Sequence, residues 1–195
     1  QKEATHLYHL ASVVGVQNYM DDPLALIDIV VVGTRNLLEL ATKYKTKVLF
    51  TSTSEIYAKN PNTPWSEQDD RVLGPTSIDR WSYSSSKAVC EHMLFALFRS
   101  NDLKFTIVRF FNVYGPRSRT SGTYGAVFGV FLAQKLAKKP FTIVGDGSQT
   151  RDFTYVSDVA DAIFLAAESE LSGRIFNVGS GETISVNRIT ELLGG

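Results

Sequence analysis

The chain has 195 residues, of which 44% are hydrophobic and 21% charged, the composition of an ordinary globular protein. Basic and acidic residues number 20 each, so no net charge draws the chain toward nucleic acid or a membrane surface, and we expect neither partner. No apolar run approaches the roughly 20 residues that a membrane span needs. The single cysteine, Cys90, excludes an intrachain disulfide and favours a cytoplasmic location, where thiols stay reduced.

The first half of the chain alternates short apolar runs with helical patterns. Proline at position 23 suits the first turn of a helix, where its missing N–H costs nothing. A polar loop over residues 59–80 precedes a strongly periodic segment. We predict strands over residues 6–11, 47–52 and 104–110, and helices over residues 24–45 and 82–100.

The second half has shorter elements and denser turn signals. We predict helices over about residues 124–138, 157–168 and 184–194, and strands over residues 141–144 and 174–178. Ser157 is the predicted N-cap of the helix over 157–168, with Asp158 in its first turn. Alternating strands and helices predict an α/β fold in which helices cover both faces of a parallel sheet.

The histidines do not indicate a metal site. In a strand, His6 and His9 point to opposite faces, because side chains alternate. The remaining histidine, His92, has no cysteine or paired carboxylate at ligand spacing. We therefore expect no metal.

Tyr83 and Lys87 lie four residues apart on a predicted helix, a spacing that places both side chains on one face. A phenol acts as a base only if its pKa falls from about 10 toward neutrality, and a neighbouring ammonium group favours that change. We expect Lys87 to hold Tyr83 ionised. Taken alone, the pair is more typical of an amphipathic surface helix than of a catalytic site.

The segment FTSTSEIY supplies a second group of polar side chains. It lies at the carboxyl end of a predicted strand, where open α/β sheets bind ligands. Thr53 offers a hydroxyl group there, and Ser54 and Glu55 follow it. These side chains could instead only cap the following turn. Together with Tyr83 and Lys87, they indicate a site that oxidises a hydroxyl group.

The ordered motifs of the chain resemble those of the extended short-chain dehydrogenase/reductases, in the branch of nucleotide-sugar epimerases, dehydratases and decarboxylases. The resemblance implies a Rossmann-like doubly wound parallel sheet and NAD as cofactor. It extends over almost the whole chain, through YHLAS (8–12), DP (22–23), GT-NLLE (33–39), TSTSEIY (51–57), YSSSK (83–87), RFFNVYGPR (109–117), GDGSQTRDFTYVSD (145–158) and FNVGSG (176–181).

This resemblance implies a role for each matching residue. Thr53, Tyr83 and Lys87 form a catalytic triad, with Tyr83 as the base and Lys87 also on the nicotinamide ribose. The implied cofactor-binding residues are Leu10, Ala11, Ser12, Tyr83, Lys87 and Phe110. The implied substrate-binding residues are Ser54, Asn112, Arg117 and Arg151. Arg151 would grip the pyrophosphate of a nucleotide sugar, although a surface ion pair with Asp152 is the alternative.

Two departures from the family pattern stand out. The glycine-rich phosphate loop and the strands around it are not found ahead of YHLAS, so we expect a segment of a longer chain that is cut at both ends. Residues 1–115 would then form a partial dinucleotide-binding domain with the catalytic residues. Residues 116–195 would contribute a small C-terminal substrate lobe and returning strands. Ala58 also replaces the glycine that usually follows the tyrosine of TSTSEIY.

Glu55 and the residues around it favour one branch of the family. The trio Thr53, Ser54 and Glu55 resembles UDP-glucuronate decarboxylases and also GDP-mannose dehydratases. The segments NYMDDP and DRWSYSSSK further resemble the decarboxylases. The segment SGTYGAVFGVFLAQ instead resembles the N-acetylhexosamine 4-epimerases. We place decarboxylation first, 4-epimerisation second and dehydration third. Glu55 is a proton donor or, alternatively, a turn residue.

Two further expectations concern assembly and activity. By the resemblance, the helices over 24–44 and 83–99 form a four-helix interface in a homodimer. A protein that kept the fold and lost the chemistry is the rival to an active enzyme. It is disfavoured because Thr53, Tyr83 and Lys87 are all present.

Overall fold

The computed structural model describes residues 4–118, 120 and 127–194. The chain divides into two compact units, each built from two segments. The first unit comprises Gln1–Phe110 and Asp161–Asn177, and the second comprises Phe111–Ala160 and Val178–Gly195. The domain division placed after residue 115 from the sequence stays a prediction.

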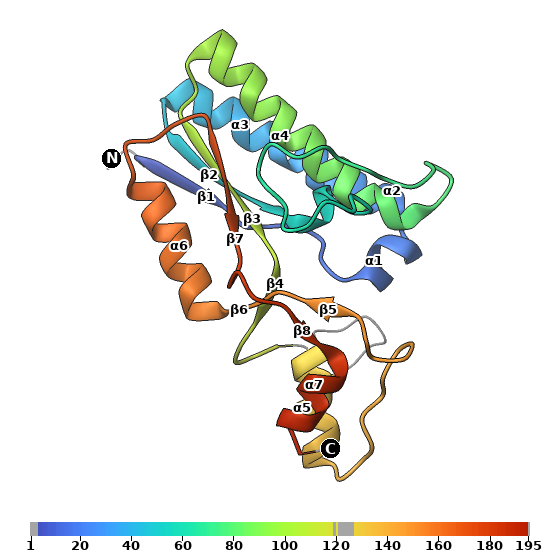
Figure 1. Cartoon of the computed structure of the whole chain (residues 1–195). Coiled ribbons are helices and arrows are strands. Elements are labelled where there is room, and N and C mark those ends of the chain that lie inside the picture. Colours follow the sequence, from blue (N-terminus) through green and yellow to red (C-terminus); the bar gives the residue numbers. More distant parts are fainter. Residues whose placement is uncertain (1–3, 119, 121–126, 195) are drawn as a thin grey trace. The chain divides into compact units, whose positions relative to one another are not determined.

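A four-stranded sheet forms the centre of the first unit (Figure 1). Its strand order is β1 (His6–His9), β2 (Lys47–Thr53), β3 (Phe105–Phe110) and β7 (Arg174–Val178). Strand β2 pairs in parallel with both β1 and β3. Helices α3 (Gly33–Tyr44) and α4 (Ser82–Asn101) lie on one side of this sheet, and α6 (Val156–Glu168) lies on the other. The predicted α/β class with a parallel sheet is confirmed.

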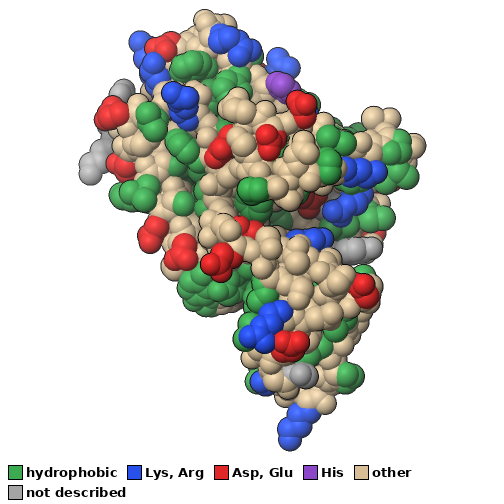
Figure 2. Space-filling view, in the orientation of Figure 1, with side chains coloured by type: hydrophobic (Ala, Val, Ile, Leu, Met, Phe, Trp, Pro, Cys, Tyr) green, Lys and Arg blue, Asp and Glu red, His purple; other side chains and the backbone are tan. Residues whose placement is uncertain are grey.

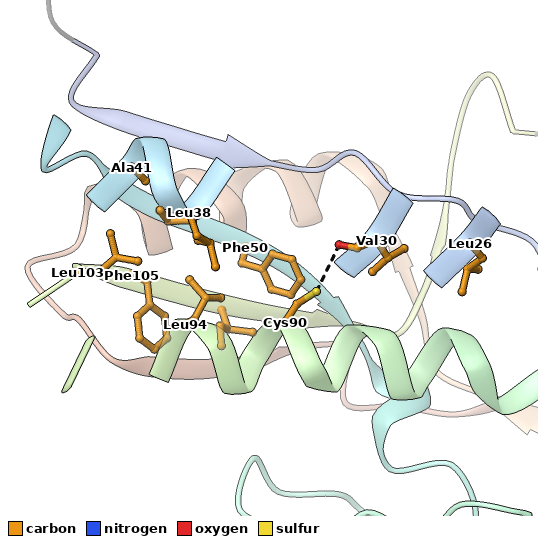
Figure 3. Packing of buried hydrophobic residues seen from close by; sticks show 11 residues of the cluster. Leu26, Val30, Leu38, Ala41, Phe50, Cys90, Leu94, Leu103 and Phe105 are labelled. Atoms are coloured by element: carbon orange, nitrogen blue, oxygen red, sulfur yellow. Dashed lines mark hydrogen bonds between the residues drawn. The ribbon is translucent and has the colours of Figure 1, made fainter. Parts of the chain in front are cut away.

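The long helix predicted over residues 24–45 contains a wider turn. It begins as α2 (Pro23–Ile27), where the Asp22 carboxylate accepts a hydrogen bond from the Ala25 amide at 2.9 Å. It continues as a π-helical segment, η1 (Asp28–Val32), and then as α3. The thiol of Cys90 donates to the Val30 carbonyl at 3.4 Å (Figure 3), so a side chain of α4 contacts the π segment.

Apolar side chains fill the space between the sheet and these helices (Figure 3). A short helix, α1 (Val16–Asp21), which the sequence did not predict, precedes α2. The buried members of this core cluster come from the helical stretch, from α4, from β2 and β3, and from the connection between α4 and β3: Leu26, Val30, Leu38, Ala41, Val48, Phe50, Cys90, Leu94, Leu103, Phe105 and Ile107.

The second unit has smaller elements. Strands β4 (Asn112–Tyr114) and β6 (Phe153–Tyr155) pair in parallel, and β5 (Thr150–Arg151) and β8 (Ile184–Ser185) pair in antiparallel fashion. Helices α5 (Val127–Leu136) and α7 (Val186–Leu192) enclose a core of Phe131, Val186 and Ile189. Ser185 caps α7 by accepting a hydrogen bond from the Arg188 amide at 3.1 Å.

Three predictions for this half are corrected or bounded. Residues 141–144 are not a strand, because the Gln134 side chain bonds both the amide and the hydroxyl of Thr142. Ser157 is not the N-cap of α6, since the helix already begins at Val156, and its hydroxyl instead bonds Asp158. Helix α5 begins at Val127, and residues 124–126 of the predicted helix lie outside the described residues.

Charges of both signs are interspersed over the visible face of the first unit (Figure 2), as the equal numbers of basic and acidic residues suggest. Among the helices of the described ranges, none combines the length and the apolar character that crossing a membrane requires.

Ala58 gives a first test of the backbone. Its φ of 47° lies in the left-handed region, which costs an L-residue about 1–2 kcal/mol. We expect Ala58→Gly to raise the free energy of unfolding by up to about 1 kcal/mol, because glycine's greater freedom in the unfolded state offsets part of the relief. Denaturant unfolding measures the change.

The control is Ala96→Gly, the same substitution at an exposed position inside α4. It should lower the free energy of unfolding by about 1 kcal/mol. Equal losses in both variants would contradict the assignment of strain to Ala58.

Candidate active site

The predicted strand ends meet at one edge of the sheet in the first unit. In the parallel register, Thr53 at the end of β2 faces Phe110 at the end of β3. On the other side of β2, His9 at the end of β1 is paired with Phe50. Leu10, Ala11 and Ser12 follow β1 directly. The carboxyl ends of three strands therefore carry most of the predicted site residues.

Four of these residues come together around a phenol. Tyr83 lies in the first turn of α4, and its hydroxyl group makes side-chain hydrogen bonds with Ser12 and Thr53. Glu55 is close enough for its charge to act on the same phenol. Thr53 also caps the turn η2 (Ser54–Ile56), by accepting a hydrogen bond from the Glu55 amide at 3.2 Å. Capping and contact with Tyr83 are therefore combined in Thr53.

The expected ionisation of Tyr83 is wrong for the chain as it stands. Burial, and then the charge of Glu55, raise the pKa of Tyr83 to about 12. The hydrogen bonds of Ser12 and Thr53 lower this pKa, but they do not offset the first two effects. Tyr83 is therefore a protonated phenol at neutral pH, which can donate a proton and is poorly prepared to accept one.

Lys87 lies one helical turn beyond Tyr83 and is 2% exposed. Its ammonium group donates a hydrogen bond of 2.8 Å to the carbonyl of Thr51, in the neighbouring strand β2. It also lies 4.7 Å from the ring centroid of Phe50. Burial lowers the pKa of Lys87 to about 8, against smaller opposing effects of Cys90 and Glu91. The surface-pair alternative for Tyr83 and Lys87 is therefore wrong.

The remaining residues of the first unit lie around this centre with different exposures. Leu10 is 52% exposed, Ala11 is exposed, and Phe110 is half-buried. Ser54 is half-buried in η2, where its carbonyl accepts a hydrogen bond from the Tyr57 amide at 3.1 Å.

The other substrate-binding candidates belong to the second unit. Asn112, in β4, donates from its amide to the Asp152 carbonyl at 2.9 Å. Arg117 is exposed in a turn and has a left-handed φ of 65°. Arg151 is exposed in β5, and its guanidinium donates to the Thr150 carbonyl. Asp152 accepts hydrogen bonds from Ser180 and Gly181, so its carboxylate faces the turn after β7 rather than Arg151.

A buried polar network behind the site was not predicted. Arg109 of β3 bonds both carboxylate oxygens of Glu91 on α4, at 2.6 and 3.1 Å. It also donates to the Tyr57 hydroxyl at 2.7 Å. The signal was present in the sequence, because an arginine interrupts the apolar run FTIVRFF, and Glu91 lies four residues after Lys87 on the same face of α4.

Within the described residues, no group of three or more His, Cys, Asp or Glu side chains is arranged to hold a metal ion. A model of the NAD dependent epimerase/dehydratase family matches residues 1–179. The chain belongs to this family. The predicted family is confirmed, and NAD as cofactor is confirmed as a property of that family.

Relatives within the epimerase/dehydratase family cover most of this chain. A UDP-N-acetyl-alpha-D-glucosaminuronate decarboxylase from Bacillus cytotoxicus is 42% identical over 185 residues, 95% of this chain and 57% of the relative. UDP-glucuronic acid decarboxylase 4 from Arabidopsis thaliana is 36% identical over 178 residues, 91% of this chain and 39% of the relative. The chain therefore spans about half the length of the curated relatives it matches.

Solved structures of the family agree with the fold. The structure of UDP-N-acetylglucosamine 4-epimerase from Methanobrevibacter ruminantium M1, in complex with UDP-N-acetylmuramic acid, is similar with a TM-score of 0.89 and 32% identity. The match covers 96% of this chain and 59% of that chain. The predicted Rossmann-like fold is thereby confirmed.

The buried Lys87 makes stability depend on pH. Its pKa falls from an ordinary value of 10.5 to about 8 on folding, so the unfolded chain binds more protons between these values. The free energy of unfolding therefore rises as the pH increases from 8 to 10.5, and this gain is lost again as the pH falls from 10.5 to 8. Lys87→Met lacks this dependence. We expect the free energy of unfolding of the wild type to rise by roughly 3 kcal/mol relative to that of Lys87→Met over this range.

Denaturant unfolding at a series of pH values measures this difference. Lys104→Met, which removes a half-exposed lysine paired with Asp102, is the control for loss of a lysine. Parallel curves for the wild type and Lys87→Met would contradict the buried position of the ammonium group.

Proposed function

We propose that this protein oxidises a hydroxyl group of a nucleotide sugar at Tyr83, with NAD as cofactor, and that the resulting keto-sugar then loses carbon dioxide. The observation that carries the proposal is the arrangement of Tyr83, Ser12 and Thr53 around one phenol. Two hydroxyl groups and a carboxylate surround a group that can exchange a proton, and a buried ammonium lies one turn away.

The residues of the first unit are suited to hold NAD. In the part of the chain that the structure describes, Lys87 makes one hydrogen bond, to Thr51, although an ammonium group has three donors. The other two could bind ribose hydroxyls. Leu10, Ala11 and Ser12 follow β1 at the same edge, where Phe110 ends β3. When bound, NAD supplies a hydride acceptor and a positive charge.

In this proposal Tyr83 takes the proton of the sugar hydroxyl while Thr53 orients that hydroxyl by a hydrogen bond. A positive charge nearby lowers the pKa of a phenol. Tyr83, with a pKa of about 12, needs a change in that direction to act as a base. The proton can return from Tyr83 when the ketone is reduced.

Decarboxylation follows from the position of a carboxylate β to the new ketone. The bond between the ring carbon and the carboxylate breaks, carbon dioxide leaves, and the electron pair passes to the carbonyl oxygen. The ring carbon then takes a proton from solvent, which Glu55 relays. The two decarboxylase relatives support this reaction and a nucleotide-linked uronic acid as substrate. Ser54, Asn112, Arg117 and Arg151 are the proposed substrate-binding residues.

A 4-epimerase is the second candidate, favoured by the similarity to the Methanobrevibacter ruminantium enzyme. In that reaction the ketone is reduced from its other face and no carbon–carbon bond breaks. A 4,6-dehydratase is the third candidate. The alternative that is not an enzyme is a truncated protein with the same fold and no activity.

Mass spectrometry of products from a panel of nucleotide sugars tests the reaction. With the full-length protein, we expect a nucleotide-linked uronic acid to lose the mass of one carbon dioxide. Tyr83→Phe removes the proton-transfer group and should reduce turnover by at least about 100-fold. Loss of the mass of water would indicate dehydration in place of decarboxylation, and an unchanged mass with altered chromatography would indicate epimerisation.

We further propose that the protein is a homodimer through the helical stretch α2–η1–α3 and α4. This stretch presents large apolar side chains to solvent, and α4 adds Val89. Many large apolar side chains exposed on neighbouring helices are typical of a protein interface. The exposed side chains are Leu24, Ile27, Ile29, Val32, Leu40 and Tyr44.

Sedimentation of Leu24→Glu tests the interface, because a buried unpaired carboxylate opposes association. We expect the wild type to sediment as a dimer and this variant to shift toward the monomer. Leu165→Glu, at a residue of α6 with matched exposure (68% against 67%), should leave the dimer intact. A monomeric wild type would contradict the proposal.

A further inference from the structure

The ammonium group of Lys87 is buried with few polar partners. It is 2% exposed, and the Thr51 carbonyl at 2.8 Å is its hydrogen-bond acceptor within the described part of the chain. Glu91 acts on it through its charge, but both oxygens of that carboxylate are already bonded by Arg109. A buried charge requires compensation, so another group must contribute to the stability of the ammonium.

Phe50 is placed to make this contribution. Its ring centroid lies 4.7 Å from Nζ of Lys87, and the ring is fully buried. The face of an aromatic ring attracts a cation within about 6 Å, more strongly where water is excluded. Figure 3 shows Phe50 between β2 and α4, beside Cys90. Because Phe50 and Thr51 are consecutive, one stretch of β2 provides both contacts to the ammonium.

The other side chains around Phe50 and Lys87 add little positive charge. His9 packs on Phe50 with ring centroids 5.5 Å apart, and its Nε2 is bonded to the Thr34 hydroxyl at 2.8 Å. Burial, and then the charge of Lys87, lower the pKa of His9, so this imidazole stays neutral. The titratable groups whose charges act on the ammonium are Cys90 and Glu91, both on α4.

We propose that Phe50 is a positioning residue for Lys87: the face of the Phe50 ring keeps the ammonium group charged and fixed at the carboxyl end of β2. The inference rests on the proposed role of Lys87 but extends it to a residue that contacts neither substrate nor cofactor in that role. A leucine at position 50 would keep the site apolar and remove the ring face. Lys87 would then lose its proton at a lower pH.

The test is an NMR titration of the lysine side-chain signals, with Lys87→Met identifying the Lys87 signal. We expect Phe50→Leu to lower the midpoint of Lys87 by about one pH unit. Phe105→Leu is the matched control. Phe105 is equally buried in the same core, but its rings in contact are those of Phe95 and Phe98, so the Lys87 midpoint should not move.

Fluorinated phenylalanines at position 50 separate the ring's electrostatics from its shape. Increasing fluorination weakens the negative face of the ring with little change in size, so the Lys87 midpoint should fall stepwise. The same series at position 105 should leave it unchanged. An unchanged midpoint in Phe50→Leu and in the fluorinated series would overturn the proposal, and folding losses in the leucine variant do not affect the second measurement.

Activity of the full-length protein provides an independent readout. If Lys87 must be charged, the alkaline limb of the pH–rate profile should move to lower pH in Phe50→Leu and not in Phe105→Leu. Absence of turnover in the wild type with every nucleotide sugar would refute the proposed function, while the titration would still decide the role of Phe50.

Discussion

The polar stripe on the sheet-facing side of α4 is the constraint on which the first unit depends. Tyr83, Lys87 and Glu91 recur every four residues, and the last two are buried. A buried charge is tolerated only where a partner meets it, and losing one partner of such a pair typically costs about 3–5 kcal/mol. The sheet supplies the partners in order: β2 offers the Thr51 carbonyl to Lys87, and β3 offers Arg109 to Glu91. Helix α4 can therefore occupy only one position along the strands.

Arg109 of the same ion pair also holds the loop that joins Thr53 to Tyr83 in the candidate site. This loop leaves β2 after Thr53 and returns to α4 just before Tyr83. Arg109 donates to the hydroxyl of Tyr57 and to the carbonyl of Glu67, and the Tyr57 hydroxyl donates to Asn177 at 2.8 Å. The start of the loop at Tyr57 and its middle at Glu67 thus depend on contacts with Arg109 in the core.

The sequence predicts those features that depend on local pattern. Strands β2 and β3 are continuous apolar runs, and the periodicity of α4 is strong, so their positions are found within one or two residues. The strand-end hydroxyl of Thr53 is found for the same reason. The π turn at Asp28–Val32 leaves no such trace, because it shifts hydrogen bonds within an unchanged helical pattern. The ionisation of Tyr83 was wrong because a spacing of four gives a shared face but not the groups that the face meets. Burial and Glu55 act on the phenol, while Lys87 turns to Thr51.

The protonated state of Tyr83 has a chemical consequence. Tyr83, with a pKa of about 12, and the neutral His9 carry no charge at neutral pH. Lys87 supplies a positive charge at this end of the sheet, where its ammonium group contacts the Phe50 ring and the Thr51 carbonyl. A base that is ionised at rest would attract protons and solvent even without substrate. A phenol that remains protonated until a positive charge arrives becomes basic only when the site is filled. Under the proposed function, the carboxylate of Glu55, which raises the pKa of Tyr83, would contribute to the timing of proton transfer. The environment of Tyr83 fits a cofactor that brings its own charge, as the NAD dependence of the family requires.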